Sequence, residues 1–144
     1  MSQVVVHGID HVLYLSVADP AASLAFYDRL MPFLCFAKLR RAMTVAIAAY
    51  ESRAARLTLH MTPAAGGSIP VDRYRLGLHY LSLEVGSRQE VDAVHQELVA
   101  MGAEVLDPPT DYPHYRETFY ALFFNDPNDI KLEIVCRSWE DENQ

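Results

Sequence analysis

The chain has 144 residues, of which 51% are hydrophobic and 22% charged, and this is ordinary for one globular domain. Its formal net charge of −7 argues against nucleic acid or an anionic membrane surface as a partner. No apolar run reaches the roughly 18 residues of a membrane-spanning helix, and the N-terminus lacks the pattern of a signal peptide. Cys35 and Cys136 lie beside apolar residues, which predicts buried free thiols and a cytoplasmic location.

The first half of the chain predicts a strand, a helix and three further short strands. Towards the end of residues 4–17 apolar and polar residues alternate, as in a strand with one buried face. Asp19 and Pro20 predict the start of a helix, with Asp19 as its N-cap, and Pro32 predicts its end. The three shorter strands are expected near residues 35–39, 44–50 and 56–61.

A segment rich in Pro, Gly and Ser separates this half from the next. Residues 63–75 contain the weakest pattern in the chain and predict a linker. The expected organisation is a first module over residues 1–62 and a second over residues 76–144, together forming one domain. A unit of about sixty residues with one open sheet face is marginal alone, so the two modules are expected to pack together.

The second half repeats the pattern of the first. A shift of 68 positions, which places His11 on His79, aligns the alternating strand residues of the two halves. A second helix is expected over about residues 88–101, with Gly102 as its stop. A short strand at residues 105–106 follows, before two consecutive prolines.

Residues 119–136 contain two apolar runs around an Asp/Asn/Pro cluster, which is typical of a β-hairpin. Asn128 and Asp129 tolerate positive φ, so the turn is expected there. In the second run Leu132 shares a face with the other aliphatic residues, and Glu133 points the other way. Because an unpaired buried carboxylate is costly, Glu133 is expected either to reach solvent or to face a polar cavity. The predicted fold class is α+β, built from two βαβββ modules.

These paired modules resemble the vicinal-oxygen-chelate superfamily, which includes glyoxalases, bleomycin-resistance proteins and extradiol dioxygenases. The residues that carry the resemblance are 11–12 and 23–27 in the first module, and 77–80, 123–127 and 131–133 in the second. The resemblance implies a cupped, barrel-like mixed sheet with the helices outside. It also implies a small molecule held in the cup, and a homodimer.

In catalytic members of this family a divalent metal lies in the cup. Its ligands are a His early in the first strand, a His early in the matching strand and the Glu of the last strand, which Glu133 matches. Counting back from the valine near the end of each of the two strands puts Val12 and Tyr80 at the other two positions. His11 and His79 then fall one residue earlier, on the face that packs on the helices. The sequence therefore predicts no cofactor and no tight metal.

The predicted cup is rich in tyrosine. If a metal is bound, Glu133 is expected to hold it with His11, His79 or His60. Otherwise Glu133 would orient a small ligand or act as a catalytic base, and the alternative is that the rings simply fill the interior. The predicted ligand-binding residues are Tyr14, Ser16, His60, Tyr80, Ser82, Tyr120 and Glu133.

Three functions stay open on these grounds. The first, which the positions of the histidines favour, is a metal-independent binding or sequestering protein. The second is a metal-dependent lyase, isomerase or dioxygenase, with Glu133 as a metal ligand. The third is a structural or regulatory module whose cup is filled. Whether the protein is an enzyme is left open, and so are the identity of its substrate and the role of residues 112–116, a loop that the family often uses to cover the cup.

Overall fold

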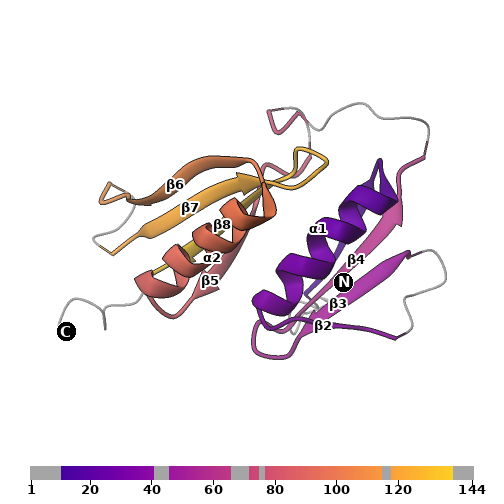
Figure 1. Ribbon diagram of the computed structural model, residues 1–144, viewed down its shortest axis with the longest axis horizontal. Coiled ribbons are helices and arrows are strands. Elements are labelled where there is room, and N and C mark those ends of the chain that lie inside the picture. Colours follow the sequence, from indigo (N-terminus) through magenta and orange to yellow (C-terminus); the bar gives the residue numbers. More distant parts are fainter. Residues whose placement is uncertain (1–10, 41–45, 66–71, 75–76, 115–117, 138–144) are drawn as a thin grey trace, which may run out of the picture.

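A computed structural model of the protein describes residues 11–40, 46–65, 72–74, 77–114 and 118–137. Each half of the chain forms a strand, a helix and three further strands (Figure 1). The first half contains β1 (Val12–Val17), α1 (Pro20–Phe33), β2 (Ala37–Lys38), β3 (Ala48–Ser52) and β4 (Leu57–Pro63). The second half contains β5 (Leu81–Val85), α2 (Arg88–Met101), β6 (Val105–Asp111), β7 (Tyr120–Asn125) and β8 (Lys131–Cys136). The predicted α+β fold of two βαβββ modules is thereby confirmed.

The strands form two four-stranded mixed sheets with matching topology. Sheet A has the order β1-β4-β3-β2, and sheet B has the order β5-β8-β7-β6. The first strand of each module pairs in parallel with the last, with Tyr14 opposite His60 in sheet A and Ser82 opposite Glu133 in sheet B. The shift of 68 positions places Tyr14 on Ser82. Because His60 pairs with Tyr14 as Glu133 pairs with Ser82, His60 is the structural counterpart of Glu133.

Helix α1 begins as its sequence predicts. The Asp19 side chain accepts hydrogen bonds from the backbone N–H groups of Ala21 and Ala22, at 3.0 and 3.1 Å. Such a cap satisfies donors that have no partner within the helix. The helix continues to Phe33, so Pro32 lies in its last turn and does not end it at once.

Helix α2 has the predicted bounds, and the turn of the hairpin lies at the predicted position. The Ser87 hydroxyl oxygen accepts a hydrogen bond from the Glu90 N–H at 3.2 Å, and Gly102 ends the helix with φ of 71°. Positive φ costs glycine little because it has no Cβ atom. Asp129, with φ of 62°, makes the predicted reversal between β7 and β8. No helix in the described part of the chain is long and apolar enough to cross a membrane.

Three local expectations differ from the structure or lie outside it. Strand β6 continues through Pro108 and Pro109 with two shifts of register, which is tolerated because β6 is an edge strand. The sequence predicts a buried Cys35, but this residue is exposed, at φ of 59° after α1, whereas Cys136 is buried as predicted. Residues 4–10 of the expected first strand lie outside the described residues.

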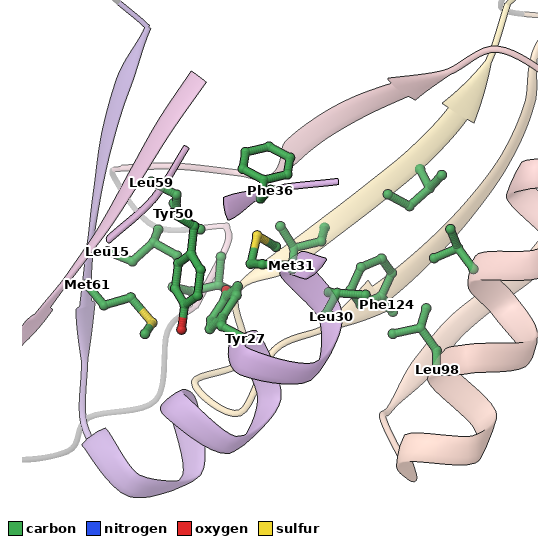
Figure 2. Packing of buried hydrophobic residues seen from close by; sticks show 14 of the residues in the cluster. Leu15, Tyr27, Leu30, Met31, Phe36, Tyr50, Leu59, Met61, Leu98 and Phe124 are labelled. Atoms are coloured by element: carbon green, nitrogen blue, oxygen red, sulfur yellow. The ribbon is translucent and has the colours of Figure 1, made fainter. Parts of the chain in front are cut away.

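One hydrophobic core includes residues of both modules. Figure 2 shows Tyr27 and Leu30 of α1 between Leu59 of sheet A and Phe124 of sheet B. The Tyr27 hydroxyl also donates a hydrogen bond of 2.7 Å to Asp126, beyond the end of β7, and burial together with this carboxylate raises the pKa of Tyr27. The helix of the first module thus packs against the sheet of the second, and the opposite face of each sheet lies outside this core.

Candidate functional site

Glu133 lies in the middle of the second sheet, on the face turned away from the helices. Its neighbours in register are Ser82 on β5 and Phe123 on β7. Leu132 and Ile134, on either side of it in sequence, belong to the core on the other face. This confirms the predicted alternation of β8. Glu133 is 0% exposed, so it does not reach solvent directly.

The Glu133 carboxylate is an unsatisfied buried group. Neither of its oxygens has a hydrogen-bond partner among the described residues. Burial raises the pKa of Glu133, and the nearby hydroxyl of Ser82, the cations Arg137 and Lys131 and the hydroxyl of Tyr80 offset this effect in part, although neither hydroxyl lies in hydrogen-bonding geometry with the carboxylate. A carboxylate in such surroundings is more readily protonated than one in water, and each of its oxygens can still accept a hydrogen bond from a ligand.

Aromatic rings and two cations surround this carboxylate. The Phe123 ring lies 6.0 Å from the ring of Tyr80 and 5.9 Å from that of Tyr112, centroid to centroid. The Lys131 ammonium lies 4.3 Å from the Phe123 centroid, and the Arg137 guanidinium lies 5.4 Å from that of Phe119. Sequence reasoning did not assign Phe123, Lys131 or Arg137 to the site, although each has the same strand parity as Glu133 or pairs with it.

The equivalent face of sheet A contains His60. The His60 ring stacks on that of Tyr14 with centroids 4.5 Å apart and planes 8° from parallel. His60 is only 7% exposed, and its Nδ1 has no hydrogen-bond partner among the described residues. Ser16 follows Tyr14 on the same face of β1 and is exposed. Each module thus buries one unsatisfied ionisable side chain at the equivalent position.

A groove of about 790 Å³ lies between β1 and β5, which are the outer strands of their sheets. Val12 of β1 and Ser82 of β5 both line it. Its volume falls within the range of roughly 300–1,000 Å³ typical of small-molecule sites. Glu133 itself does not line the groove, but its register neighbour Ser82 does, so Ser82 separates the groove from the buried carboxylate.

The structure places Tyr120 elsewhere, so its predicted position in the cup is wrong. The Tyr120 hydroxyl donates a 2.7 Å hydrogen bond to Asp92 on α2, and the Arg88 guanidinium lies 4.0 Å from its ring centroid. Burial and the Asp92 carboxylate raise the pKa of Tyr120 to about 12. Tyr120 therefore helps to attach α2 to sheet B. On β7, the residues that share the face of Glu133 are those that alternate with Tyr120, namely Ala121 and Phe123.

The prediction that His11 and His79 lie on the face that packs against the helices is wrong, because both lie outside the strands. His11 precedes β1 and His79 precedes β5, and both are exposed. His79 Nδ1 lies 3.0 Å from the carbonyl oxygen of Arg73. Within the described residues no three His, Cys, Asp or Glu side chains could hold a metal ion together. The cations Lys131 and Arg137 near Glu133 also oppose a divalent cation, so the described residues do not fit a metal there.

Comparisons with known proteins agree with this fold. The family model for the Glyoxalase/Bleomycin resistance protein/Dioxygenase superfamily matches residues 8–134. The uncharacterized protein YqjT of Bacillus subtilis (strain 168) is 35% identical over 66 residues, which cover 46% of this chain and 52% of that protein. The match therefore spans about half the length of this relative.

Two solved structures are similar over nearly the whole chain. A glyoxylase/bleomycin resistance protein/dioxygenase domain from Frankia sp. EAN1pec is 25% identical with a TM-score of 0.75, covering 94% of this chain and 95% of that one. The fosfomycin resistance protein FosX from Listeria monocytogenes is 16% identical with a TM-score of 0.67, covering 95% and 98%. Because the family model matches most of its length, the chain belongs to the Glyoxalase/Bleomycin resistance protein/Dioxygenase superfamily.

Proposed function

We propose that this protein binds a small organic molecule in the groove between β1 and β5, with the polar end of the ligand at Glu133. The observation that carries the proposal is the fully buried Glu133 carboxylate, whose two oxygens have no hydrogen-bond partner among the described residues. Ser82, which pairs with Glu133 across the two strands, lines the open groove. Buried polar groups in folded proteins are nearly always paired, so a persistent exception calls for a partner that binds there. A hydroxyl or amide donor of a ligand would supply it.

The binding is proposed to need no resident metal. Glu133 has cations near it and belongs to no group of three metal-ligating side chains in the described residues. The alternative is a lyase, isomerase or dioxygenase that uses a divalent metal at Glu133. A mutant of FosX was solved in complex with Mn(II) and 1S,2S-dihydroxypropylphosphonic acid, at 14% identity to this chain. At that identity the likeness concerns the fold alone, so the first proposal is preferred.

Catalysis without a metal is the second candidate function. A carboxylate whose pKa is raised by burial is a better proton acceptor near neutral pH than an ordinary one. Glu133 would then remove a proton from a bound substrate. We place this activity in the cytoplasm, where a free exposed thiol such as Cys35 stays reduced.

A thermal-shift screen of small organic compounds tests the binding proposal. Ligands that bind the native state raise the melting temperature by mass action. We expect hits that stabilise the wild-type protein and lose at least half of that shift in Glu133→Gln. Glu97→Gln is the matched control, because Glu97 forms a surface ion pair with Arg29 on the helices. Equal shifts in the wild type and Glu133→Gln would contradict the proposal.

We also propose that the protein forms a homodimer. Four large apolar side chains on or next to the strands that border the groove are 40–46% exposed, namely Val12, Tyr14, Leu78 and Tyr80. Exposed apolar clusters of this kind often mark interfaces. Sedimentation velocity should therefore give about twice the chain mass of 16.3 kDa, and Tyr14→Ser should shift the equilibrium towards the monomer. A mass of one chain at every concentration would refute the dimer.

A further inference from the structure

We propose that the ligand at Glu133 is a small organic acid, and that Arg137 binds its acid group. This inference rests on the proposed binding function and names the chemical class of the ligand. It depends on three features of the same face: the row of charges along β8 and its end, an unsatisfied donor of Arg137, and the aromatic rings beside both cations.

The row of charges comes from strand alternation. Lys131, Glu133 and Val135 share one face of β8, and Arg137 follows immediately with the same parity. The row therefore has two cations and one carboxylate, in a protein whose net charge is −7. Glu84 of β5, opposite Val135, and Asp107 of β6, opposite Phe123, lie on the same face, so the excess of positive charge is confined to the β8 row. An anionic group is therefore favoured next to Arg137 itself, and not over the face as a whole.

Arg137 has an unsatisfied donor. Its Nε is buried and has no hydrogen-bond partner among the described residues, and no described ion pair includes its guanidinium. Glu133 does not fill this role, because its own oxygens also have no partner. A guanidinium donates in a planar fork that matches carboxylate or phosphonate oxygens. A ligand acid group would therefore satisfy Arg137 without displacing a protein partner.

The body of the ligand is inferred from the rings. Phe119 lies beside Arg137, and Phe123 and Tyr80 lie beside Lys131, whose ammonium is 4.3 and 5.6 Å from their centroids. Aromatic surfaces next to a cation accept a flat apolar group and keep water from the charge. The expected ligand has a compact apolar body, an acid group at Arg137 and a hydrogen-bond donor that reaches Glu133.

Benzoate and its neutral isostere benzamide are the probes for this inference. Titration calorimetry on the full chain should show benzoate binding at least tenfold more tightly than benzamide. Arg137→Gln should raise the Kd of benzoate about tenfold, which is the smallest loss expected for a hydrogen bond to a charged group. The same substitution should change the Kd of benzamide by no more than about twofold. Arg137→Lys, which keeps the charge without the Nε donor, should fall between. Arg29→Gln is the matched control, because Arg29 pairs with Glu97 away from this face.

The possible outcomes separate this inference from the proposed function. If benzamide binds as well as benzoate, or Arg137→Gln weakens both equally, the acid-binding role is wrong although the face still binds ligands. If neutral compounds from the screen bind through Glu133 and benzoate does not, the inference again fails while the function stands. If neither probe nor any screened compound binds, both fail. A melting temperature for each variant shows whether it is folded. If Arg137→Gln is not folded, Arg137→Lys tests whether Arg137 binds the acid group.

Discussion

Replacing Leu132 with alanine should lower the free energy of unfolding by roughly 2–5 kcal/mol, as expected for a large side chain removed from a packed core. Leu132 is 2% exposed, and it lines a small cavity together with Tyr27 and Leu30 of α1 and Leu59 of sheet A. Its truncation therefore weakens packing within the second module and between the modules. Urea unfolding followed by circular dichroism measures the change.

Val99→Ala is the control for this prediction. Val99 also lies in the second module but is 61% exposed on α2, so its truncation should change stability by no more than about 0.5 kcal/mol. A loss below about 1 kcal/mol for Leu132→Ala would place Leu132 at the surface. The two faces of β8 would then be reversed, and Glu133 would point into the core.

Replacing Glu133 with glutamine should stabilise the ligand-free protein at pH 8. Glutamine has nearly the same shape but carries no charge, so it avoids the cost of burying an unpaired carboxylate. We expect a gain of roughly 1–3 kcal/mol in the free energy of unfolding. Most single substitutions lower the free energy of unfolding or leave it unchanged. An increase in Glu133→Gln would therefore be informative.

The gain should depend on pH in a definite direction. The pKa of Glu133 is raised in the folded state, so the folded protein binds the proton more tightly than the unfolded chain does. The wild type therefore loses stability as pH rises from the ordinary Glu pKa of about 4.3 through the raised value. The advantage of Glu133→Gln should be small at pH 4 and largest at pH 8. An equal advantage at both values, or a loss at pH 8, would show that Glu133 is satisfied in the folded protein.

Much of this site could be predicted from alternation alone. The parity of β8 separates Leu132 from Glu133 because successive side chains of a strand point to opposite faces. The same rule places Tyr14 and Ser16 on one face of β1, opposite Leu15 and Val17. The helix ends were predictable for a similar reason, because caps such as Asp19 and Gly102 satisfy local backbone requirements.

The rest depends on contacts that a local pattern does not contain. Tyr120 lies near the same hairpin as Glu133, but its partner Asp92 is 28 residues away on α2. Cys35 is flanked by apolar residues, yet it occupies a left-handed turn at the surface after α1. The surroundings of Arg137 depend on the register of β7 and β8, since Tyr120 pairs with Cys136 and Phe119 therefore lies beside the Arg137 guanidinium. These placements follow from tertiary packing, which overrides local composition.

The metal content of the purified protein tests the central claim, that this face binds its ligand without a resident metal. The protein is incubated with manganese, iron, nickel or zinc, desalted, and analysed for retained metal beside Glu133→Ala and His79→Ala. A tight site needs several ligand atoms about 2.0–2.2 Å from one ion, and the described residues around Glu133 do not provide them. The predicted result is far less than one metal per chain, unchanged in both variants. Near-stoichiometric retention in the wild type that is lost in both variants would contradict it.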